Sequence, residues 1–365
     1  MRIESTIVET DPRIPATWRV LSVLLKDEPL SQADLRERTG LSHPVIVQRV
    51  AQLRRAGLIA MGQPTSGKPG RPRTPMSFNW EFRRLLAVEV QRTGITAQAS
   101  NLHGEALGDA RVTPITSWTL AAVRKALETA IRAALAETGA PWAGVAVLVP
   151  GTVAVDGRTL VECAGLTGAA NVPLGQDLSA AFGLPVVLFA DGATLACAAW
   201  NARAADTQTV LAITLRHPER IGLGLIIEGQ LIRSAGSAPG GIAHIAIPNT
   251  GSLGTLLADA AQRPAAMRAL AEALAPLAVA LQPNELIIQG DSAWSDADGD
   301  TLHTALLAAC GTGCAVRVEM RSSRAEESLD GGLTLLSRHL LDLRTGLLAG
   351  WARTAVPEPE PVGAF

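Results

Sequence analysis

The chain has 365 residues, of which 47% are hydrophobic and 18% are charged, which excludes a disordered chain and predicts two or three compact units. Its charge is divided unevenly. Residues 1–84 contain 14 Lys and Arg against 8 Asp and Glu, a net of +6, whereas residues 85–365 contain 18 against 26, a net of −8. We therefore expect the N-terminal part to face nucleic acid and the acidic remainder to stay away from it.

Cysteine usage and hydropathy indicate the compartment. The chain has four cysteines, Cys163, Cys197, Cys310 and Cys314. They are too few and too scattered for a disulfide framework, which favours a reducing cytoplasm. Residues 1–11 mix charges without an apolar core, and no apolar run approaches the roughly 20 residues that span a bilayer. We expect a cytoplasmic protein that does not enter a membrane.

The first predicted helix follows Pro15 and ends before Pro29. Trp18, Leu21 and Leu25 lie on one face of it at helical spacing. Trp18 could be a functional aromatic residue, but its spacing with the leucines favours a core position. This helix would complete a three-helix unit with the two that follow.

Residues 31–57 have the pattern of a helix-turn-helix. Ser31-Gln32-Ala33-Asp34 is a capping box that starts one helix, and a glycine turn at Gly40 leads to a second helix capped by Ser42. In the second helix the positions 46, 50 and 53 are apolar and form one inward stripe, and Gly57 ends it. The second helix of such a pair has the width to enter the DNA major groove.

Charge and the following segment support a DNA-binding role. No Asp or Glu occurs between Thr39 and Trp80, and a short strand at 58–61 leads to the basic turn Ser66-Gly67-Lys68-Pro69-Gly70-Arg71-Pro72-Arg73. This turn resembles the wing of a winged helix or a hook for the minor groove, where arginine is attracted to the negative potential of A·T-rich DNA. An ordinary helical pair with a solvated basic loop is the alternative.

We assign roles to the residues of this segment. Gln48 and Arg49 would read or position against the major groove. Three residues would lie at the entrance of the recognition helix: Ser42, His43 and Pro44. Three cations of the turn would contact backbone or minor groove: Lys68, Arg71 and Arg73. Because one such module covers little DNA, we expect a homodimer or higher homo-oligomer on a double-stranded operator with an inverted repeat.

The remainder of the chain has an α/β pattern. Strands are predicted at 85–91, 95–101, 105–112 and 144–149, with a long helix from Leu120 to Leu135. A buried strand at 185–191 ends in Asp191 and is followed by a helix at 194–204. Further strands are predicted at 210–215, 222–227, 231–234, 286–288 and 316–318, and a last helix at about 325–341. The order is similar in the two halves, which indicates two lobes of related build.

At this point the residues resemble the ROK family of sugar kinases and sugar-responsive repressors. The resemblance covers nearly the whole chain and rests on these stretches: Thr39-Gly40-Leu41-Ser42, Gly70-Arg71-Pro72, Val149-Pro150-Gly151-Thr152-Val153, Gly157, Asn171-Val172-Pro173-Leu174, Phe189-Ala190-Asp191 and Gly222-Leu223-Gly224-Leu225-Ile226-Ile227-Glu228-Gly229. It implies a winged helix-turn-helix followed by a two-lobed, actin-like ATPase (ribonuclease H-like) body.

The kinase motifs of the family are altered here. Kinase members hold nucleotide phosphates on an Asp-x-Gly-Gly-Thr hairpin, because glycines let backbone amides approach closely. The matching positions read Glu89-Val90-Gln91-Arg92-Thr93, without either glycine. We therefore expect no ATP binding, no catalytic residue and no sugar phosphorylation.

The sugar and zinc motifs are also incomplete. Asp191 and His244 match sugar ligands of the family, but Ala190 and Gly241 replace polar partners, so an effector with fewer hydroxyls than a hexose, or none, is expected. Alternatively, Asp191 caps a helix and His244 is a satisfied, partly buried histidine. The cysteine cluster that binds zinc in many members is missing from residues 248–255, so we expect no metal and no cofactor.

The sequence thus predicts a winged helix-turn-helix at 1–82, a ROK-like two-lobed domain at 83–350 and a flexible Pro/Glu tail at 351–365. The function that follows is a DNA-binding transcriptional regulator, most simply a repressor, whose body dimerises and senses a sugar or small metabolite. A carbohydrate kinase that acquired a DNA-binding domain is the alternative. A body that only holds a dimer together is a third.

Overall fold

The computed structural model describes residues 15–26, 29–63, 74–137, 139–163, 165–203, 207–217, 220–232, 241–248, 251–290, 294–311, 315–322 and 324–342. The chain forms two compact units. One contains the residues up to Arg84, with Asn101–Glu105 and the end of the last helix from Ser337. The other contains Leu85–Ser100 and Ala106–Leu336.

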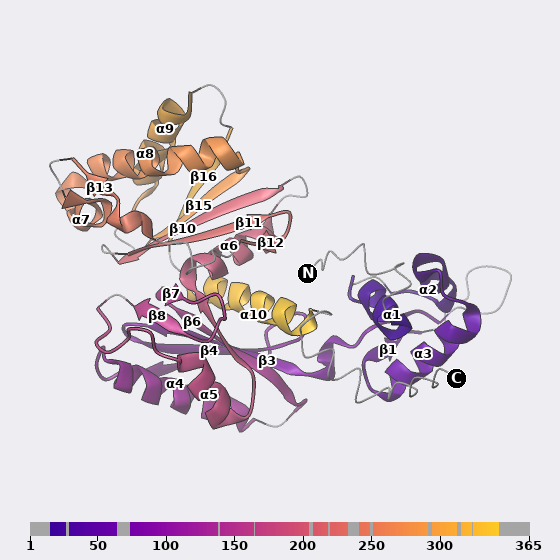
Figure 1. Ribbon diagram of the computed structural model, residues 1–365. Coiled ribbons are helices and arrows are strands. Elements are labelled where there is room, and N and C mark those ends of the chain that lie inside the picture. The colour runs from indigo at the N-terminus through magenta and orange to yellow at the C-terminus, as the bar shows by residue number, and fades with distance from the viewer. Residues whose placement is uncertain are drawn as a thin grey trace, which may run out of the picture. The chain divides into compact units, whose positions relative to one another are not determined.

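The first unit is a three-helix bundle with a two-stranded hairpin (Figure 1). Its elements are α1 (Ala16–Leu24), α2 (Gln32–Thr39), α3 (His43–Arg55), β1 (Ile59–Met61), β2 (Met76–Phe78) and the short helix η1 (Trp80–Phe82). Fully buried leucine and isoleucine side chains from all three helices form its core, among them Leu21, Leu35 and Ile46. Leu21 and Leu25 of the predicted inner face of α1 are fully buried, whereas Trp18 is only half-buried at its edge. Val20 and Val23 are buried as well.

The second unit contains two five-stranded sheets with the same strand order. The first sheet has the order β5-β4-β3-β6-β9, and the second has the order β12-β11-β10-β15-β16. In each sheet the strand that comes first in the chain, β3 or β10, is central. The second and third strands lie on one side of it, and the fourth and fifth lie on the other side. This repeat confirms the predicted relation between the two halves.

The elements of the first lobe agree with most of the predicted ones. They are β3 (Arg84–Gln91), β4 (Gly94–Asn101), β5 (Arg111–Pro114), α4 (Leu120–Leu135), β6 (Trp142–Val149), β7 (Gly151–Val153), β8 (Leu160–Cys163), α5 (Leu174–Phe182) and β9 (Val186–Ala190). The strand predicted at 105–112 is present, antiparallel to β4, but it begins later than predicted, after an isolated bridge at Ala106. Gly108 has a positive φ of 75° that breaks the extended run, and the strand begins only at Arg111.

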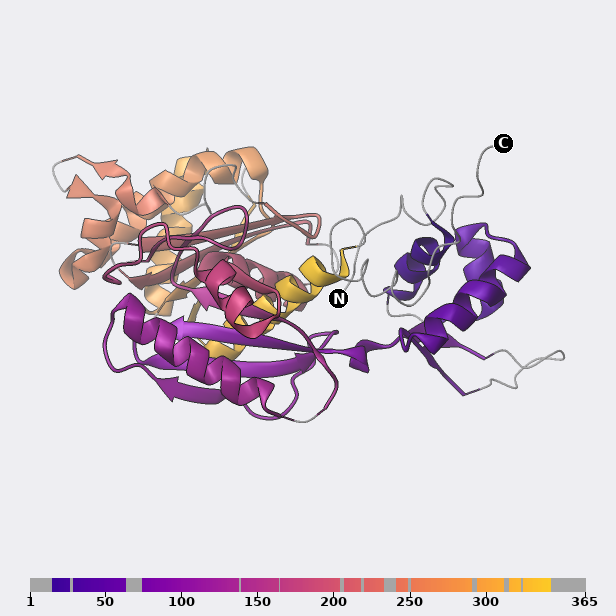
Figure 2. The ribbon, with the colours of Figure 1, turned by 60° about the horizontal axis from the view of Figure 1, so that its bottom comes forward.

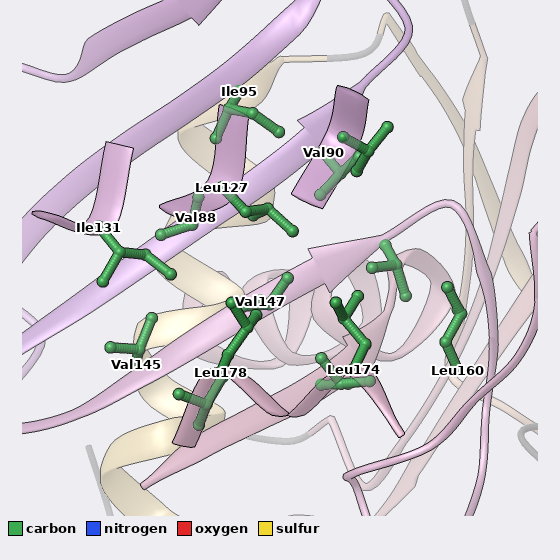
Figure 3. Close-up of a cluster of buried hydrophobic side chains, with 14 of the residues drawn as sticks. Val88, Val90, Ile95, Leu127, Ile131, Val145, Val147, Leu160, Leu174 and Leu178 are labelled. Atoms are coloured by element: carbon green, nitrogen blue, oxygen red, sulfur yellow. The ribbon is translucent and has the colours of Figure 1, made fainter. Parts of the chain in front are cut away.

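Helices α4 and α5 cover one face of this sheet (Figure 2). Figure 3 shows Leu127 of α4 and Leu178 of α5 packed against Val145 and Val147 of β6. Leu148, one step along β6, points to the other face, where it lies against Gly332. The apolar run of β6 is therefore explained by burial on both faces.

The second lobe has helices on both faces of its sheet (Figure 1). Its elements are α6 (Asp191–Ala202), β10 (Thr209–His217), β11 (Arg220–Ile227), β12 (Gln230–Leu231), η2 (Gly241–His244), β13 (Ala246–Ile247), β14 (Gly251–Ser252), α7 (Leu253–Ala258), η3 (Ala260–Gln262), α8 (Arg263–Leu281), β15 (Glu285–Gly290), α9 (Asp296–Cys310) and β16 (Arg317–Ser322). The last helix, α10 (Ala325–Leu341), returns to the first sheet, where Gly332 lies against Leu148. Strand β10 pairs antiparallel with β11 and parallel with β15.

One helical segment, Ala260–Leu281, is long and apolar enough to cross a membrane by length and composition alone. Leu270 and Leu274 of this segment belong to the core cluster of the second lobe, together with Ile213 and Ile288 of its sheet. The inner face of α8 is thus a core face, which accounts for much of its apolar character.

Candidate DNA-binding surface and effector site

The helix-turn-helix is fixed by two local devices that the sequence predicts. Ser31 and Asp34 form a complete capping box, in which the Asp34 carboxylate accepts from the Ser31 backbone N–H at 2.8 Å. Gly40 ends α2 in the left-handed conformation with φ 65°, which a residue with a side chain rarely adopts. These devices set the direction of the chain into α3.

A third device was not expected from the sequence. Arg19 of α1 is buried, and its guanidinium Nη2 donates to the Thr39 carbonyl oxygen at the end of α2. Thr39 Oγ1 in turn donates to the Leu35 carbonyl at 2.5 Å. The turn between α2 and α3 is therefore held from beneath by α1, because a buried carbonyl needs a donor. An arginine within an apolar helix is the only sequence signal for this contact.

The outer face of α3 presents polar side chains at its N-terminal end. Ser42, His43, Pro44 and Gln48 are all exposed. Ser42 occupies the N-cap position, but its side chain makes no capping hydrogen bond, which corrects the predicted cap. The N-terminal N–H groups of α3 are thus not satisfied by this hydroxyl, and such groups favour phosphate.

Two further residues of α3 alter the predicted surface. Arg49 is half-buried, and its Nη1 donates to Gln52 Oε1 at 2.8 Å, so its guanidinium is held along the helix. Val47, which sequence reasoning missed, is 41% exposed beside Gln48. The sequence did contain a signal for this residue, because Val47 is an apolar side chain on an otherwise polar face of the helix. An apolar side chain at this position fits contact with the thymine methyl group.

The hairpin β1–β2 has the register of a wing. Ile59 pairs with Phe78 and Met61 with Met76, and Met76 is also bridged to Leu30 ahead of α2. The segment that connects the two strands contains the predicted contacts Lys68, Arg71 and Arg73, which lie outside the described residues. The described strands therefore fix where the connecting segment leaves and re-enters the domain.

Asp191, the first residue of α6, is a buried carboxylate at the end of β9 with both oxygens bonded. Thr214 Oγ1 of β10 donates to Asp191 Oδ2 at 2.9 Å, and the Gly192 backbone N–H donates to Oδ1 at 2.9 Å. A Cβ at Gly222 of β11 would lie 2.6 Å from Asp191 Oδ1. The carboxylate thus ties α6 to β10 and lies close against the backbone of β11.

The cap interpretation of Asp191 is only partly correct. Ala190 is the N-cap residue, and the contact with Thr194 runs from the Thr194 hydroxyl to the Asp191 carbonyl at 2.8 Å. His244 ends η2, and its side chain lies outside the described residues. The pairing of Asp191 with His244 in one effector site therefore stays a prediction.

The turn that replaces the phosphate hairpin has side chains at both positions where the family has glycine. Gln91 Nε2 donates to Glu89 Oε2 at 2.9 Å, and the Arg92 guanidinium lies 5.4 Å from the centre of the Trp118 ring. A turn of this kind offers side chains where a phosphate site needs open backbone N–H groups.

Within the described ranges, no group of three or more His, Cys, Asp and Glu residues could hold a metal ion. Cys163 and Cys197 are buried, and Cys310 Sγ donates to the Ala275 carbonyl at 3.8 Å. Cys314 lies outside the described residues. The expectation of a metal-free protein stays a prediction.

The comparisons with known proteins agree with this architecture. The ROK family matches residues 85–256, and the MarR family matches residues 14–67. The chain carries a ROK family domain behind a MarR-type winged helix. A comparison with curated proteins found no match.

Solved structures extend the similarity to both parts. A ROK family transcriptional regulator, a homolog of the E. coli MLC protein, is 19% identical over 92% of this chain and 99% of its own, with a TM-score of 0.68. A ROK family glucokinase from Streptomyces griseus, in complex with glucose and AMPPNP, is 19% identical over 69% and 98%, with a TM-score of 0.54. A ROK hexokinase from Thermus thermophilus is 20% identical over 69% and 97%, with a TM-score of 0.56. At these identities the likeness shows the fold.

Proposed function

We propose that this protein is a DNA-binding transcriptional regulator, most simply a repressor, that acts in the cytoplasm. The observation that supports this most is the exposed face of α3, which lies between the capped helix α2 and the two-stranded hairpin β1–β2. No Asp or Glu occurs between Thr39 and Trp80. The likeness to a ROK family transcriptional regulator over 92% of this chain supports the proposal. The DNA-binding part would comprise residues 1–82, the ROK domain 83–350 and a tail 351–365.

The proposed contacts divide into two kinds. Gln48 would read base edges in the major groove with Arg49 beside it, and Ser42, His43 and Pro44 would lie at the entrance of the helix. Lys68, Arg71 and Arg73 would contact the backbone or the minor groove. Gln48→Ala should change the preference among operator sequences by about 1 to 3 kcal/mol. Arg71→Ala should weaken binding to all sequences and flatten the salt dependence.

Footprinting and gel-shift titration on the DNA that flanks its gene test this proposal, with Lys125→Glu on the exposed face of α4 as a matched surface control. The proposal fails if both variants bind every DNA tested as the parent does. An inverted repeat in the protected sequence, with half-sites about one or two helical turns apart, would agree with a homodimer or higher homo-oligomer.

For the ROK domain we propose a role in dimerisation and in sensing a sugar or small metabolite, with Asp191 and His244 as its polar ligands. An effector would act only through its different affinity for free and DNA-bound protein. The alternative is a carbohydrate kinase, which the likeness to a glucokinase favours. The side chains of Gln91 and Arg92, which occupy the two glycine positions of the phosphate turn, oppose nucleotide binding and favour the regulator.

A further inference from the structure

Val47 of α3 is an apolar side chain that the described fold leaves in the open. It is 41% exposed. In the described part of the first unit the other exposed large apolar side chain is Met61, at the end of β1. Valine is a poorer helix former than alanine, so this surface position does not stabilise α3 itself. A single exposed apolar residue is common on protein surfaces, so its neighbours on the helix decide what it indicates.

Val47 belongs to an apolar row on the outer side of α3. Pro44 precedes it by three residues and Ala51 follows it by four, a spacing that places all three on one side of a helix. Pro44 is exposed and Ala51 is half-buried. The buried stripe of α3 is a separate set of residues, at positions 46, 50 and 53. The row is therefore not an extension of the core of the three-helix bundle.

The polar residues beside this row favour A·T base pairs. Gln48 is exposed in the same turn, and glutamine forms two hydrogen bonds with N6 and N7 of adenine. Arginine is the commonest reader of guanine, but the Arg49 guanidinium donates to Gln52 at 2.8 Å and is held along the helix. Arg54 and Arg55 lie in the last turn, whereas a recognition helix reads base edges through its N-terminal residues. The second turn of α3 therefore presents an adenine reader next to an apolar side chain.

We propose that Val47 is a specificity-determining residue that selects thymine by its 5-methyl group, at a base pair next to the one that Gln48 reads. This rests on the proposed DNA binding and deepens it, because it names the bases opposite the second turn of α3. The thymine methyl group is the apolar feature of the major groove, and an exposed valine matches it. Opposite a C·G pair, Val47 would meet the amino group of cytosine and remove it from water without a hydrogen bond in return.

Deoxyuridine tests the contact, because it lacks only the 5-methyl group of thymidine and keeps the base pair and its minor-groove edge. Each thymine of the footprinted DNA is replaced in turn, and gel-shift titration gives the Kd of the full chain. One position in each half-site should weaken parent binding about fourfold, the effect of one buried methyl group. Val47→Ala should weaken binding to the thymine DNA about four- to fifteenfold and show no further loss with deoxyuridine.

Two control variants keep the readout specific. Val279→Ala removes the same atoms from another exposed helical valine, 52% exposed near the end of α8, and should bind like the parent. Gln48→Ala should bind more weakly but keep the preference for thymine over uracil. Because alanine is the better helix former and Val47 is exposed, the loss in Val47→Ala does not come from unfolding of α3.

A methylated cytosine separates the methyl group from the base. At the decisive position, C·G in place of T·A should weaken parent binding, and 5-methylcytosine should restore about fourfold of it, but not in Val47→Ala. Parent binding that is unchanged by deoxyuridine at every position would overturn the inference and leave the proposed DNA binding intact. An equal deoxyuridine effect in Val47→Ala would also overturn it. A parent that selects no DNA sequence would overturn both.

Discussion

The bond between Asp191 and Thr214 provides the sharpest test of how the ROK domain uses its carboxylate. Asp191 is 8% exposed and Thr214 is 1% exposed, and the hydroxyl donates to the carboxylate at 2.9 Å. A hydrogen bond to a charged group contributes about 1.5 to 3 kcal/mol. Asp191→Ala should therefore lower the free energy of unfolding by about 2 to 3 kcal/mol, because it leaves a buried hydroxyl without its acceptor. Asp191→Asn keeps an acceptor oxygen and should cost less.

A double-mutant cycle isolates this pair. Urea unfolding of the full chain is compared for the parent, Asp191→Ala, Thr214→Val and the double variant, with the exposed Asp300→Ala as control. The coupling energy should be about 1.5 to 3 kcal/mol. A coupling energy below about 0.5 kcal/mol would refute a structural role for the carboxylate, since neighbours that do not interact are nearly additive. An effector whose binding is lost in Asp191→Asn, without loss of stability, would then identify Asp191 as a ligand.

Two further predictions concern charge and chemistry. The Arg321 guanidinium donates to Glu319 at 2.7 Å and holds the pKa of that carboxyl below its usual value of 4.5. A carboxyl whose pKa is lower in the folded state stabilises the fold at any pH above its pKa in the unfolded chain. Arg321→Gln should therefore lower the free energy of unfolding by about 1 kcal/mol at neutral pH. Because Arg321 Nη1 also donates to Glu327, the cost is measured in a Glu327→Gln background, where it should vanish as pH falls through the folded pKa of Glu319. A pH-independent cost there, or an equal one in the exposed Arg324→Gln, would contradict the prediction. Coupled assays with a panel of sugars and elemental analysis should show neither phosphorylation nor stoichiometric zinc, and turnover that disappears in Asp191→Asn would revive the kinase alternative.

Sequence reasoning succeeded where one periodicity decided an element. Helix α4 runs from Leu120 to Leu135 as its apolar row predicts, and α10 has the expected bounds. It misplaced the start of β5, because the positive φ of Gly108 interrupts the extended run between the bridge at Ala106 and the strand from Arg111. Period alone cannot distinguish an extended strand from a loop with the same alternation.

The candidate site was predictable at the level of its elements and less so at the level of contacts. The capping box and the exposed position of Gln48 follow from local spacing. The contact from Arg19 to Thr39 joins residues far apart in the chain, so no local pattern reveals it. The same holds for Thr214, which reaches Asp191 only because two separate strands meet α6.

Gly224, which belongs to a ROK-like stretch, and Gly192, which follows Asp191, have a packing role. A Cβ at Gly224 of β11 would lie 2.0 Å from the Gly192 carbonyl oxygen of α6, and a Cβ at Gly192 would lie 2.6 Å from the backbone of Leu223. Helix α6 therefore packs directly on the backbone of β11, and any side chain at these positions would separate them. The glycines of the phosphate hairpin have no such role, because β3 and β4 form around Gln91 and Arg92 without them. A ROK domain can thus lose its phosphate turn and keep its fold, whereas losing Gly192 or Gly224 would disrupt the helix–strand contact that holds Asp191 in place.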